Sequence, residues 1–455
     1  MEELNVIINE LDELIINRNF SGIKELLKDM EPMDISLVLQ EFPKKIAILF
    51  RLLPKDLAAE VFVEMDTDSQ EVLLSSFTDT ELKEVLDEIY IDDTVDIIEE
   101  MPANVVKRIL YNTDAETRKT INDILNYPDD SAGSIMTTEY VKLDEDITVE
   151  DALKRIRRTG IDKETIYTCY VTSPNRQLLG YVTAKQLLLA DEEMIISEIM
   201  DTNIIYVHTH EDKEIVANQM SKYDLLALPV VDKENRLVGI VTVDDAIDVI
   251  EEEATEDIEK MAAMLPSDKP YLLTSVFEIW KQRIPWLLLL MITATFTSQI
   301  ITGFEDKLTS VAILTAYIPM LMGSGGNAGG QTSVTIIRGL ALEEIHLKDI
   351  FKIIFKELRV SIFCGGVLAI VTFGKLFIID KWLLGIDTIT TKVSLTVSLT
   401  ILLVIIVAKL VGCVLPILAK RIGLDPAVMA SPFITTIVDA ISLLVYFGIA
   451  SAIIL

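Results

Sequence analysis

The stretch Pro319-Met320-Leu321-Met322-Gly323-Ser324-Gly325-Gly326-Asn327-Ala328-Gly329-Gly330-Gln331 places five glycines and two amide side chains inside an apolar segment long enough to cross a lipid bilayer. Each glycine costs a helix roughly 1 kcal/mol relative to alanine, and Pro319 removes a helical hydrogen bond just before the run. Irregular backbone persists at membrane depth only where protein or a water-filled cavity covers it. We therefore expect a broken helix that lines a polar path, with backbone carbonyls, Asn327 and Gln331 facing that path.

A second interpretation of the glycines is a small-residue face that packs against another membrane helix. Packing of this kind needs two small residues rather than five, and it gives no reason for Asn327 and Gln331. The polar path is therefore favoured, and the packing face is the alternative.

Charge divides the chain into two halves. Residues 271–455 carry 14 Lys and Arg against 11 Asp and Glu, a net charge of +3, whereas residues 1–270 carry 26 against 60, a net charge of −34. A strongly acidic soluble half therefore precedes an apolar membrane half. An acidic surface repels nucleic acid and attracts cations, although it also serves simply to keep a protein soluble.

Residues 1–127 have the pattern of an all-α domain made of short helices. Units of about 12 residues recur, such as Pro32–Phe42, Pro54–Met65 and Asp66–Phe77. Pro and Asp at the start of each unit suit the first turn of a helix. Stacked short helices of this period predict a small superhelical array with acidic outer faces.

Residues 128–255 contain an internal repeat. Ile135-Met136 returns as Ile199-Met200, and Asn175-Arg176-Gln177-Leu178-Leu179-Gly180 returns as Asn235-Arg236-Leu237-Val238-Gly239. Each copy is predicted to run strand, helix, strand, turn, strand, helix. The repeat resembles a pair of cystathionine-β-synthase (CBS) domains, α/β modules that pack together about a two-fold axis.

The resemblance to CBS domains also implies a nucleotide site. In that family a Gly-x-x-Thr-x-x-Asp run can hold the ribose of an adenine nucleotide, and the second copy has this run as Gly239, Thr242 and Asp245. The first copy has Gln186 where the Asp would stand. The resemblance thus implies a candidate ATP site in the second copy and not in the first.

A charged connecting helix is expected within residues 244–270, overlapping the end of the repeat, and Pro266 and Pro270 end it. A transmembrane domain of five helices is expected in residues 271–455, since each of five apolar segments approaches or exceeds the ~20 residues that cross a bilayer. The five predicted spans are Ile284–Thr302, Ser310–Ile337, Ile353–Ile379, Val393–Leu418 and Val428–Leu455.

Positive charge predicts the orientation of these spans. Most Lys and Arg that flank the spans lie on the side of the soluble half, including Arg283, Lys356 and Lys420. We expect a multi-pass protein of the plasma membrane whose acidic half is cytoplasmic.

Asp439 lies inside the last predicted span, and no basic residue lies near it in that span. A carboxylate at this depth is costly unless it faces water, a cation or a partner. Carboxylate oxygens prefer hard divalent ions, and Mg²⁺ usually keeps several waters while it touches one or two carboxylates. A glycine-lined path with one acid per chain therefore favours a hydrated Mg²⁺, and two Asp439 side chains would flank one ion if two chains met on a two-fold axis.

The Gly-Gly-Asn-Ala-Gly-x-Gln run, the five spans, the CBS pair and the acidic helical head together resemble the MgtE family of Mg²⁺ channels and transporters. That resemblance implies a homodimer in the lipid bilayer, with an ion path between subunits formed by the second and fifth spans. By motif, the implied pore residues are Asp439, the carbonyl of Thr435, Gly323, Gly326, Asn327, Gln331 and, at the cytoplasmic mouth, Glu357. The family often has Asn where this chain has Gly330, so Gln331 or a water would fill that place.

The resemblance gives the acidic half a second meaning, a sensor that closes the path when cytoplasmic Mg²⁺ binds. Carboxylates that face one another repel until an ion bridges them, so Mg²⁺ favours the compact form by mass action. The implied sensor residues are Glu60, Asp92, Asp96, Asp212, Glu214, Asp224, Asp245, Asp248, Glu253, Glu256 and Asp257.

Two other functions compete with Mg²⁺ uptake. A broader divalent transporter for Mn²⁺ or Co²⁺ is disfavoured by an oxygen-only lining. An intramembrane enzyme would need a nucleophile and a base, and the predicted spans hold only Cys364, Cys413 and Asp439 as candidates, with no histidine. We expect a transporter rather than an enzyme, with no nucleic-acid partner.

Overall fold

The computed structural model describes residues 2–267, 271–272, 274–304, 311–342, 344–429 and 431–454. Residues 268–270, which end the predicted connecting segment, and most of the loop after the first predicted span lie outside the described residues. The chain divides into two compact units, Met1–Ile250 and Glu251–Leu455, and each is described by itself.

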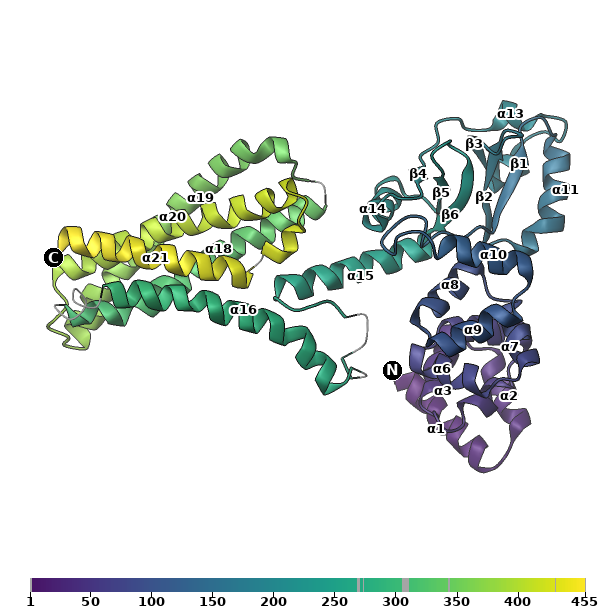
Figure 1. The fold of residues 1–455 in the computed structure, drawn as a ribbon, viewed down its shortest axis with the longest axis horizontal. Coiled ribbons are helices and arrows are strands. Elements are labelled where there is room, and N and C mark those ends of the chain that lie inside the picture. The colour runs from purple at the N-terminus through teal and green to yellow at the C-terminus, as the bar shows by residue number, and fades with distance from the viewer. Residues whose placement is uncertain are drawn as a thin grey trace. The chain divides into compact units, whose positions relative to one another are not determined.

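The first unit begins with short helices (Figure 1). Their bounds are α1 (Glu2–Ile16), α2 (Phe20–Lys28), α3 (Pro32–Gln40), α4 (Ile46–Phe50), α5 (Lys55–Val63), α6 (Thr67–Ser76), α7 (Asp79–Leu86), α8 (Ile91–Glu100), α9 (Ala103–Asn112) and α10 (Ala115–Ile124).

Local sequence fixes where these helices begin. Pro32 occupies the first turn of α3, where its missing N–H costs nothing. The Asp66 carboxylate caps α6 by accepting the Ser69 amide at 2.7 Å. The apolar faces then pack into one core that continues into the second copy of the repeat. This confirms the predicted all-α N-terminal domain.

The repeat forms two three-stranded sheets of the same topology, β1-β2-β3 and β4-β5-β6. In each sheet the first pair of strands is parallel and the second is antiparallel. The elements are β1 (Tyr140–Asp144), α11 (Val149–Thr159), η1 (Gly160–Asp162), β2 (Thr165–Thr172), β3 (Leu178–Thr183), α12 (Ala184–Leu189), α13 (Ile196–Ile199), β4 (Val207–His208), α14 (Lys213–Tyr223), β5 (Ala227–Val231), β6 (Leu237–Thr242) and α15 (Val243–Met261).

The two copies pair directly through their turns. The Leu178 amide donates to the Asn235 carbonyl at 3.1 Å, and the Leu237 amide donates to the Arg176 carbonyl at 2.9 Å. These reciprocal bonds join the two sheets into one module and confirm the predicted α/β pair.

The connecting helix is α15, and it crosses the boundary between the units. It ends at Met261, so residues 262–267 of the expected helical segment are not helical. Just after the helix ends, Ala263 has a φ of 55°, in the left-handed region that commonly terminates helices and that favours glycine.

The second unit is a bundle of long helices (Figure 1). Its elements are α16 (Val276–Gly303), η2 (Ala312–Tyr317), α18 (Ile318–Ala341), η3 (Leu347–Asp349), α19 (Ile350–Gly374), the π-helical η4 (Lys375–Leu383), α20 (Thr391–Arg421), η5 (Pro426–Met429) and α21 (Ser431–Ile453). Among the described residues, four segments are long and apolar enough to span a membrane: Val276–Gly303, Leu347–Leu383, Thr391–Arg421 and Pro426–Ile453. The glycine-rich α18 packs with them as a fifth long helix without being one of these four.

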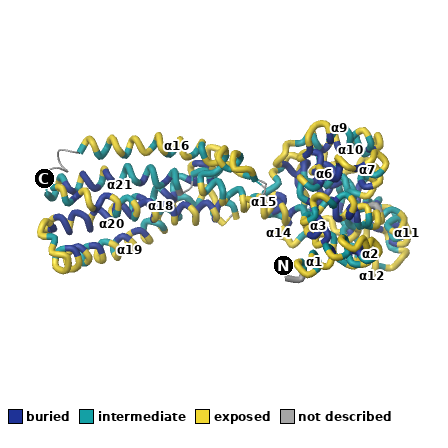
Figure 2. Tube along the Cα trace, turned by 90° about the horizontal axis from the view of Figure 1, so that it is seen from below, coloured by how far each residue is buried: buried dark blue, intermediate teal, exposed yellow. Residues whose placement is uncertain are grey.

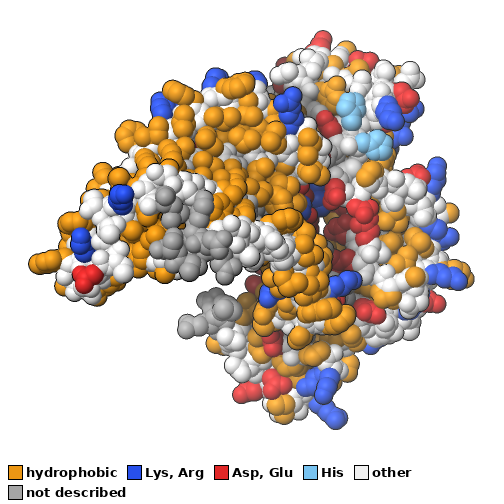
Figure 3. Space-filling view, turned by 60° about the vertical axis from the view of Figure 1, so that its left-hand side comes forward, with side chains coloured by type: hydrophobic (Ala, Val, Ile, Leu, Met, Phe, Trp, Pro, Cys, Tyr) orange, Lys and Arg blue, Asp and Glu red, His pale blue; other side chains and the backbone are white. Residues whose placement is uncertain are grey.

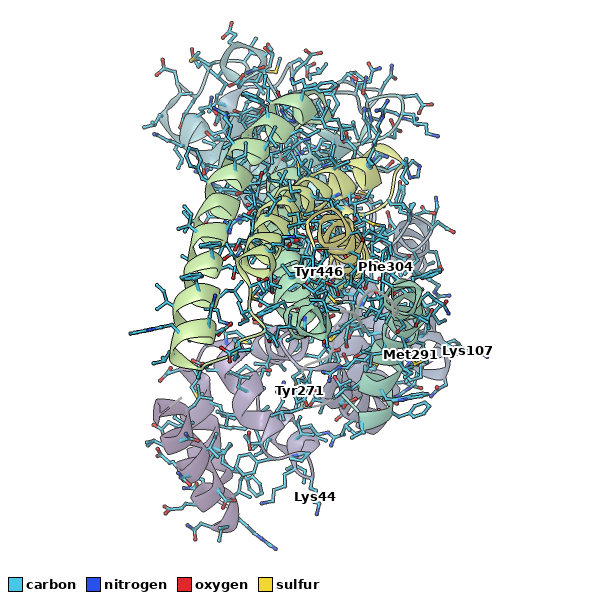
Figure 4. The ribbon with its side chains drawn as sticks, turned by 90° about the vertical axis from the view of Figure 1, so that its left-hand side faces the viewer. Lys44, Lys107, Tyr271, Met291, Phe304 and Tyr446 are labelled. Carbon is cyan, nitrogen blue, oxygen red and sulfur yellow. The ribbon has the colours of Figure 1, made fainter. Side chains whose placement is uncertain are left out.

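Burial differs sharply among the helices of this bundle. Helix α20 is buried along much of its length, whereas no described residue of α16 is buried (Figure 2). Hydrophobic side chains cover much of the bundle's visible face (Figure 3). Phe304 at the end of α16 stacks on Phe447 of α21, beside Tyr446 (Figure 4). An apolar outer surface over a packed interior is what a lipid environment requires.

The prediction of a broken helix at the glycines is wrong. Helix α18 runs without interruption through all five. A Cβ on Gly412 of α20 would lie 2.3 Å from the Gly329 carbonyl oxygen, and a Cβ on Gly325 would lie 2.7 Å from Val404. The alternative interpretation, a small-residue packing face, therefore holds for the glycine face of α18. Close contact with α20 offsets the poor helix propensity of the glycines.

Candidate functional site

A polar groove runs along the other face of α18. It has a volume of about 600 Å³ and is lined by Asn327, Gly330, Gln331, Val334 and Thr335. Asn327 and Gln331, one turn apart, are exposed. The helix thus has a glycine face turned inward and an amide face turned outward, which places both predicted amide residues on one surface.

Helix α21 supplies the carboxylate. Gly326 of α18 contacts Thr435, since a Cβ there would lie 2.8 Å from the Thr435 methyl group. Asp439 follows Thr435 by one turn, so the two residues share a face of α21. Oxygen Oδ1 of Asp439 is buried without a hydrogen-bond partner among the described residues. A buried carboxylate oxygen without a partner is suited to a cation or its waters.

The other predicted pore acid lies elsewhere. Glu357 of α19 faces Lys409 of α20, with 3.6 Å between Oε2 and Nζ, and Thr332 donates to the same carboxylate oxygen at 3.2 Å. Both charged side chains are largely buried, with exposed fractions of 16% and 9%. The structure therefore joins Glu357 to a lysine that sequence analysis did not single out, rather than to the groove.

A second group of acids lies in the soluble unit, and we call it the acidic seam. It is defined by carboxylates of α8, of the first repeat copy and of α15 whose charges act on one another. Its members are Asp92 and Asp93 of α8, Glu139 before β1, Glu164 before β2, and Asp244 and Asp245 of α15. The Ile91 amide donates to Glu139 at 3.0 Å, which ties the start of α8 to the first repeat copy.

Burial and mutual repulsion raise the pKa of several carboxyl groups in the seam. Burial, reinforced by Asp245 and Asp244, raises the pKa of Asp93 to about 7. Burial and the same two neighbours, with Asp93, raise the pKa of Glu164 to about 8. Asp92 is 8% exposed, and burial followed by Asp245 raises its pKa well above the ordinary range. Asp92 Oδ1 and Glu164 Oε2 are buried without partners among the described residues.

The seam is not a ready-made metal cage. Within the described residues, no three His, Cys, Asp or Glu side chains lie close enough to hold a metal ion directly. Carboxylates that affect one another's pKa without converging fit an ion that keeps its waters, as Mg²⁺ does.

The remaining predicted sensor residues of the first unit lie on its surface. Glu60 on α5 and Asp96 on α8 are exposed. Asp212 caps α14 by accepting the Glu214 amide at 2.9 Å, and Asp224 ends that helix in the left-handed region. Asp248 of α15 acts on Asp245. Only Asp92 and Asp245 of the predicted set are members of the seam, with Asp248 beside it.

A third polar cluster lies in the second unit, where α15 meets the bundle. Lys260 Nζ lies 2.7 Å from Glu256 of its own helix and 2.7 Å from Asp425 of the turn between α20 and α21. Burial, Asp425 and Lys260 act in that order on Asp257, whose pKa is raised. Glu253 lies one turn before these residues. Lys260 thus makes a polar contact between α15 and the bundle, beside the apolar packing of Met261 on Ile337 and Ala427.

The predicted nucleotide residues have structural roles. The Thr242 hydroxyl donates to Asp245 at 2.6 Å and the Thr242 amide donates to the same oxygen, so Asp245 caps α15. Gln186 caps α12 through Thr183 in the first copy. A Cβ on Gly239 would lie 2.8 Å from the Thr137 carbonyl oxygen, so glycine is needed for close packing.

Several residues of these clusters escaped sequence analysis. Glu139 and Glu164 lie in no acidic run, and their backbones meet only because β1 pairs with β2. Lys260, Asp425 and Lys409 are ordinary charges in sequence. A lone lysine inside an apolar span was the one available signal, since such a charge needs a partner.

Comparison with known proteins covers nearly the whole chain. Residues 318–449 match the model of the MgtE divalent cation transporter family, residues 30–130 match the MgtE intracellular N domain, and residues 132–193 and 196–252 match the CBS domain. Magnesium transporter MgtE of Thermus thermophilus is 36% identical over 445 residues, which is 97% of each chain. Magnesium transporter MgtE of Bacillus subtilis is 34% identical, again over 97% of each chain.

Solved structures match the soluble half. The cytosolic domain of the Mg²⁺ channel MgtE in complex with ATP is 36% identical with a TM-score of 0.51, covering 53% of this chain and 99% of that one. The soluble part of a magnesium transporter is 30% identical with a TM-score of 0.51, covering 55% of this chain and 99% of that one. With the soluble N-terminal domains and the apolar helices, these relatives place the protein in the membrane as a multi-pass transporter. The chain belongs to the MgtE family of magnesium transporters.

Proposed function

We propose that the chain is one subunit of a homodimeric Mg²⁺ channel that admits Mg²⁺ down the membrane potential. The observation that carries the proposal is the buried Asp439 carboxylate oxygen, which has no partner among the described residues, on α21, whose Thr435 and Val438 pack against the glycine face of α18. For a divalent ion, the membrane potential supplies about 4.6 kcal/mol per 100 mV. No ATP-hydrolysing loop of the Gly-x-x-x-x-Gly-Lys-Ser/Thr kind occurs in the sequence.

The amide face of α18 supports a dimer. Asn327, Gln331 and Thr335 are exposed on this surface, and polar side chains at membrane depth belong in a water-filled path rather than in lipid. A second copy placed about a two-fold axis would enclose the groove and bring two Asp439 residues to one ion. Mg²⁺ would pass with most of its waters, which the amides of Asn327 and Gln331 would contact.

Flux into liposomes tests the pore. Asp439→Asn keeps the size of the side chain and removes the charge, so we expect Mg²⁺ entry to fall to the level of empty liposomes. Asp387→Asn, at an exposed acid between η4 and α20, is the matched control and is expected to conduct like the parent. Mg²⁺ entry through Asp439→Asn at the parent's rate would contradict the proposed pore.

Closure by cytoplasmic Mg²⁺ is the second part of the proposal. The acidic seam joins α8, the first repeat copy and α15 by carboxylates that repel when ionised. An ion that binds the compact arrangement better than an open one shifts the equilibrium toward it. Helix α15 begins in the seam and continues into the second unit. Binding of Mg²⁺ at the seam would therefore affect the pore through this helix.

Protease protection tests this coupling without measuring flux. We expect Mg²⁺ to protect residues 244–267 in the parent and not in Asp245→Ala, Asp248→Ala. Equal protection of parent and double variant would exclude these two acids as Mg²⁺ bridges.

A broader divalent transporter remains the second candidate, because the family model that matches the bundle is that of a divalent cation transporter. Competition of Co²⁺ and Mn²⁺ with Mg²⁺ in the same liposomes decides between them. Oxygen ligands predict weak competition by both ions.

We further propose one adenine nucleotide site at Gly239, Thr242 and Asp245. A relative's cytosolic domain binds ATP, and the Thr242–Asp245 pair fixes the start of α15. Titration calorimetry with ATP should show binding by the parent and none by Thr242→Val. Absence of heat with the parent would refute the site.

A further inference from the structure

A buried polar triad lies behind the groove, inside the membrane unit. Lys409 Nζ donates to the Thr332 hydroxyl at 3.1 Å, and that hydroxyl donates to Glu357 Oε2 at 3.2 Å. Thr332 is 3% exposed and Lys409 is 7% exposed. The triad links three helices, α18, α20 and α19, through one hydroxyl that accepts from the lysine and donates to the carboxylate.

Stability alone is a weak reason for this arrangement. Charges at membrane depth are costly, and replacing a buried ion pair with apolar residues of similar volume is often neutral or stabilising. Hydrogen bonds from a hydroxyl between the two charged side chains depend on orientation. They can therefore fix the rotation of a helix, which apolar contacts do less well.

Helix α18 needs such a directional contact. At Gly325 and Gly329 its inward face receives side chains of α20 and α21 and contributes none of its own, so the interlocking side chains of α18, such as Leu321 and Ile336, lie before and after this crossing. Contacts between smooth helix faces restrict the rotation of a helix about its axis less than interlocking side chains do. Thr332 follows Gln331 directly, and successive helical residues are rotated by about 100°, so turning Thr332 also turns Gln331.

We propose that Thr332, Glu357 and Lys409 are positioning residues that fix the rotation of α18 and thereby aim Asn327 and Gln331 into the groove. The inference rests on the proposed function for its effect on ion selectivity. It does not rest on that function for its effect on the orientation of the helix. Loss of the triad lets α18 turn, so the amides meet the waters of the ion less well.

Labelling of a cysteine at position 331 measures the orientation directly. In a Cys364→Ser background, which removes the exposed native thiol, Gln331→Cys is labelled with a water-soluble thiol reagent. Thr332→Val keeps the shape of the side chain and loses both hydrogen bonds, whereas Thr332→Ser keeps the hydroxyl. We expect Thr332→Val to change the labelling rate about tenfold and Thr332→Ser to leave it unchanged.

The double variant Lys409→Met, Glu357→Met removes both hydrogen-bond partners of Thr332 and leaves no unpaired charge, so it is expected to fold and to label like Thr332→Val. Asp380→Asn, which breaks the pair between exposed Lys375 and buried Asp380, controls for a general loosening of the bundle. Labelling at the parent's rate in both Thr332→Val and the double variant would overturn the inference. An equal change in Asp380→Asn would also overturn it.

Selectivity is the functional measurement. In liposomes we expect Thr332→Val to lose about tenfold in the ratio of Mg²⁺ to Co²⁺ entry, with Thr332→Ser at the parent's ratio. If folded Thr332→Val keeps the parent's ratio of Mg²⁺ to Co²⁺ entry while Asp439→Asn admits no Mg²⁺, the triad's role is refuted and the proposed channel is not. A parent that passes no Mg²⁺ would refute the channel, while the labelling result would still decide the orientation of α18.

Discussion

Raising the pH in the absence of divalent ions should loosen the acidic seam, and Mg²⁺ should prevent it. A carboxyl group whose pKa is higher in the folded state than in the unfolded chain stabilises the fold at low pH. That stability is complete below the unfolded pKa, near 4, and is lost as the pH rises through the folded pKa. For Asp245, Asp93 and Glu164 the folded values are about 6, 7 and 8. The loss therefore falls between about pH 4 and pH 8.

The size of the effect follows from Asp93. A tenfold change in a proton-binding constant is worth about 1.4 kcal/mol, so a pKa of about 7 in place of 3.8 makes its ionisation cost about 4 kcal/mol more in the folded state. We take this value for the seam as a whole, because one proton or one cation relieves the repulsion on its neighbours as well. Hydrogen exchange that requires opening of the seam would then speed up by about a thousandfold at most.

Hydrogen exchange of peptides from α8 and β2 is the suitable assay. All three tryptophans, at 280, 286 and 382, lie in the second unit, so their fluorescence does not report on the seam. Protection factors, which remove the intrinsic pH dependence of exchange, should fall between about pH 4 and pH 8 without Mg²⁺ and stay high with it. Asp93→Asn with Glu164→Gln should weaken the dependence and leave only the part due to Asp92 and Asp245, whereas exposed Glu71→Gln should preserve it in full. Protection that is independent of pH, or raised equally by Mg²⁺ at both ends of the range, would refute the reasoning.

Two further predictions concern the bundle. Lys260→Met leaves Glu256 and Asp425 facing each other without a cation, so in Mg²⁺-free buffer a protease should cut residues 251–267 faster in the variant than in the parent; equal rates would show that Lys260 does not hold α15. Gly412→Ala forces a Cβ against the Gly329 carbonyl and should destabilise the bundle by about 1–3 kcal/mol in thermal unfolding. Gly366→Ala, which meets no atom within 4 Å, is its control, and equal melting of the two variants would contradict the close contact.

Much of the architecture follows from local pattern. The apolar spans, the short capped helices and the repeated Asn-Arg turn each reflect a regularity that neighbouring residues impose, so the sequence predicted the helical head, the CBS pair and the membrane bundle. The amide pair Asn327 and Gln331 shares a face for the same reason, since residues four apart in a helix lie above one another.

The local sequence does not decide whether the glycines break helix α18 or let it pack closely against its neighbours. Glycine lowers helix propensity in isolation, and only the close approach of α20 and α21 restores the helix. The contacts that Asp439 makes likewise depend on which helix covers α21.

The sequence by itself determined the order of domains, the charge of each half and the acid inside the last span, because these depend on composition and on spacing along one chain. Tertiary structure alone decided that Glu139 and Glu164 join Asp93, that Lys260 meets Asp425, and that Glu357 pairs with Lys409. Those groups are far apart in the chain, and their electrostatic energies depend on distance and burial, which no local pattern encodes.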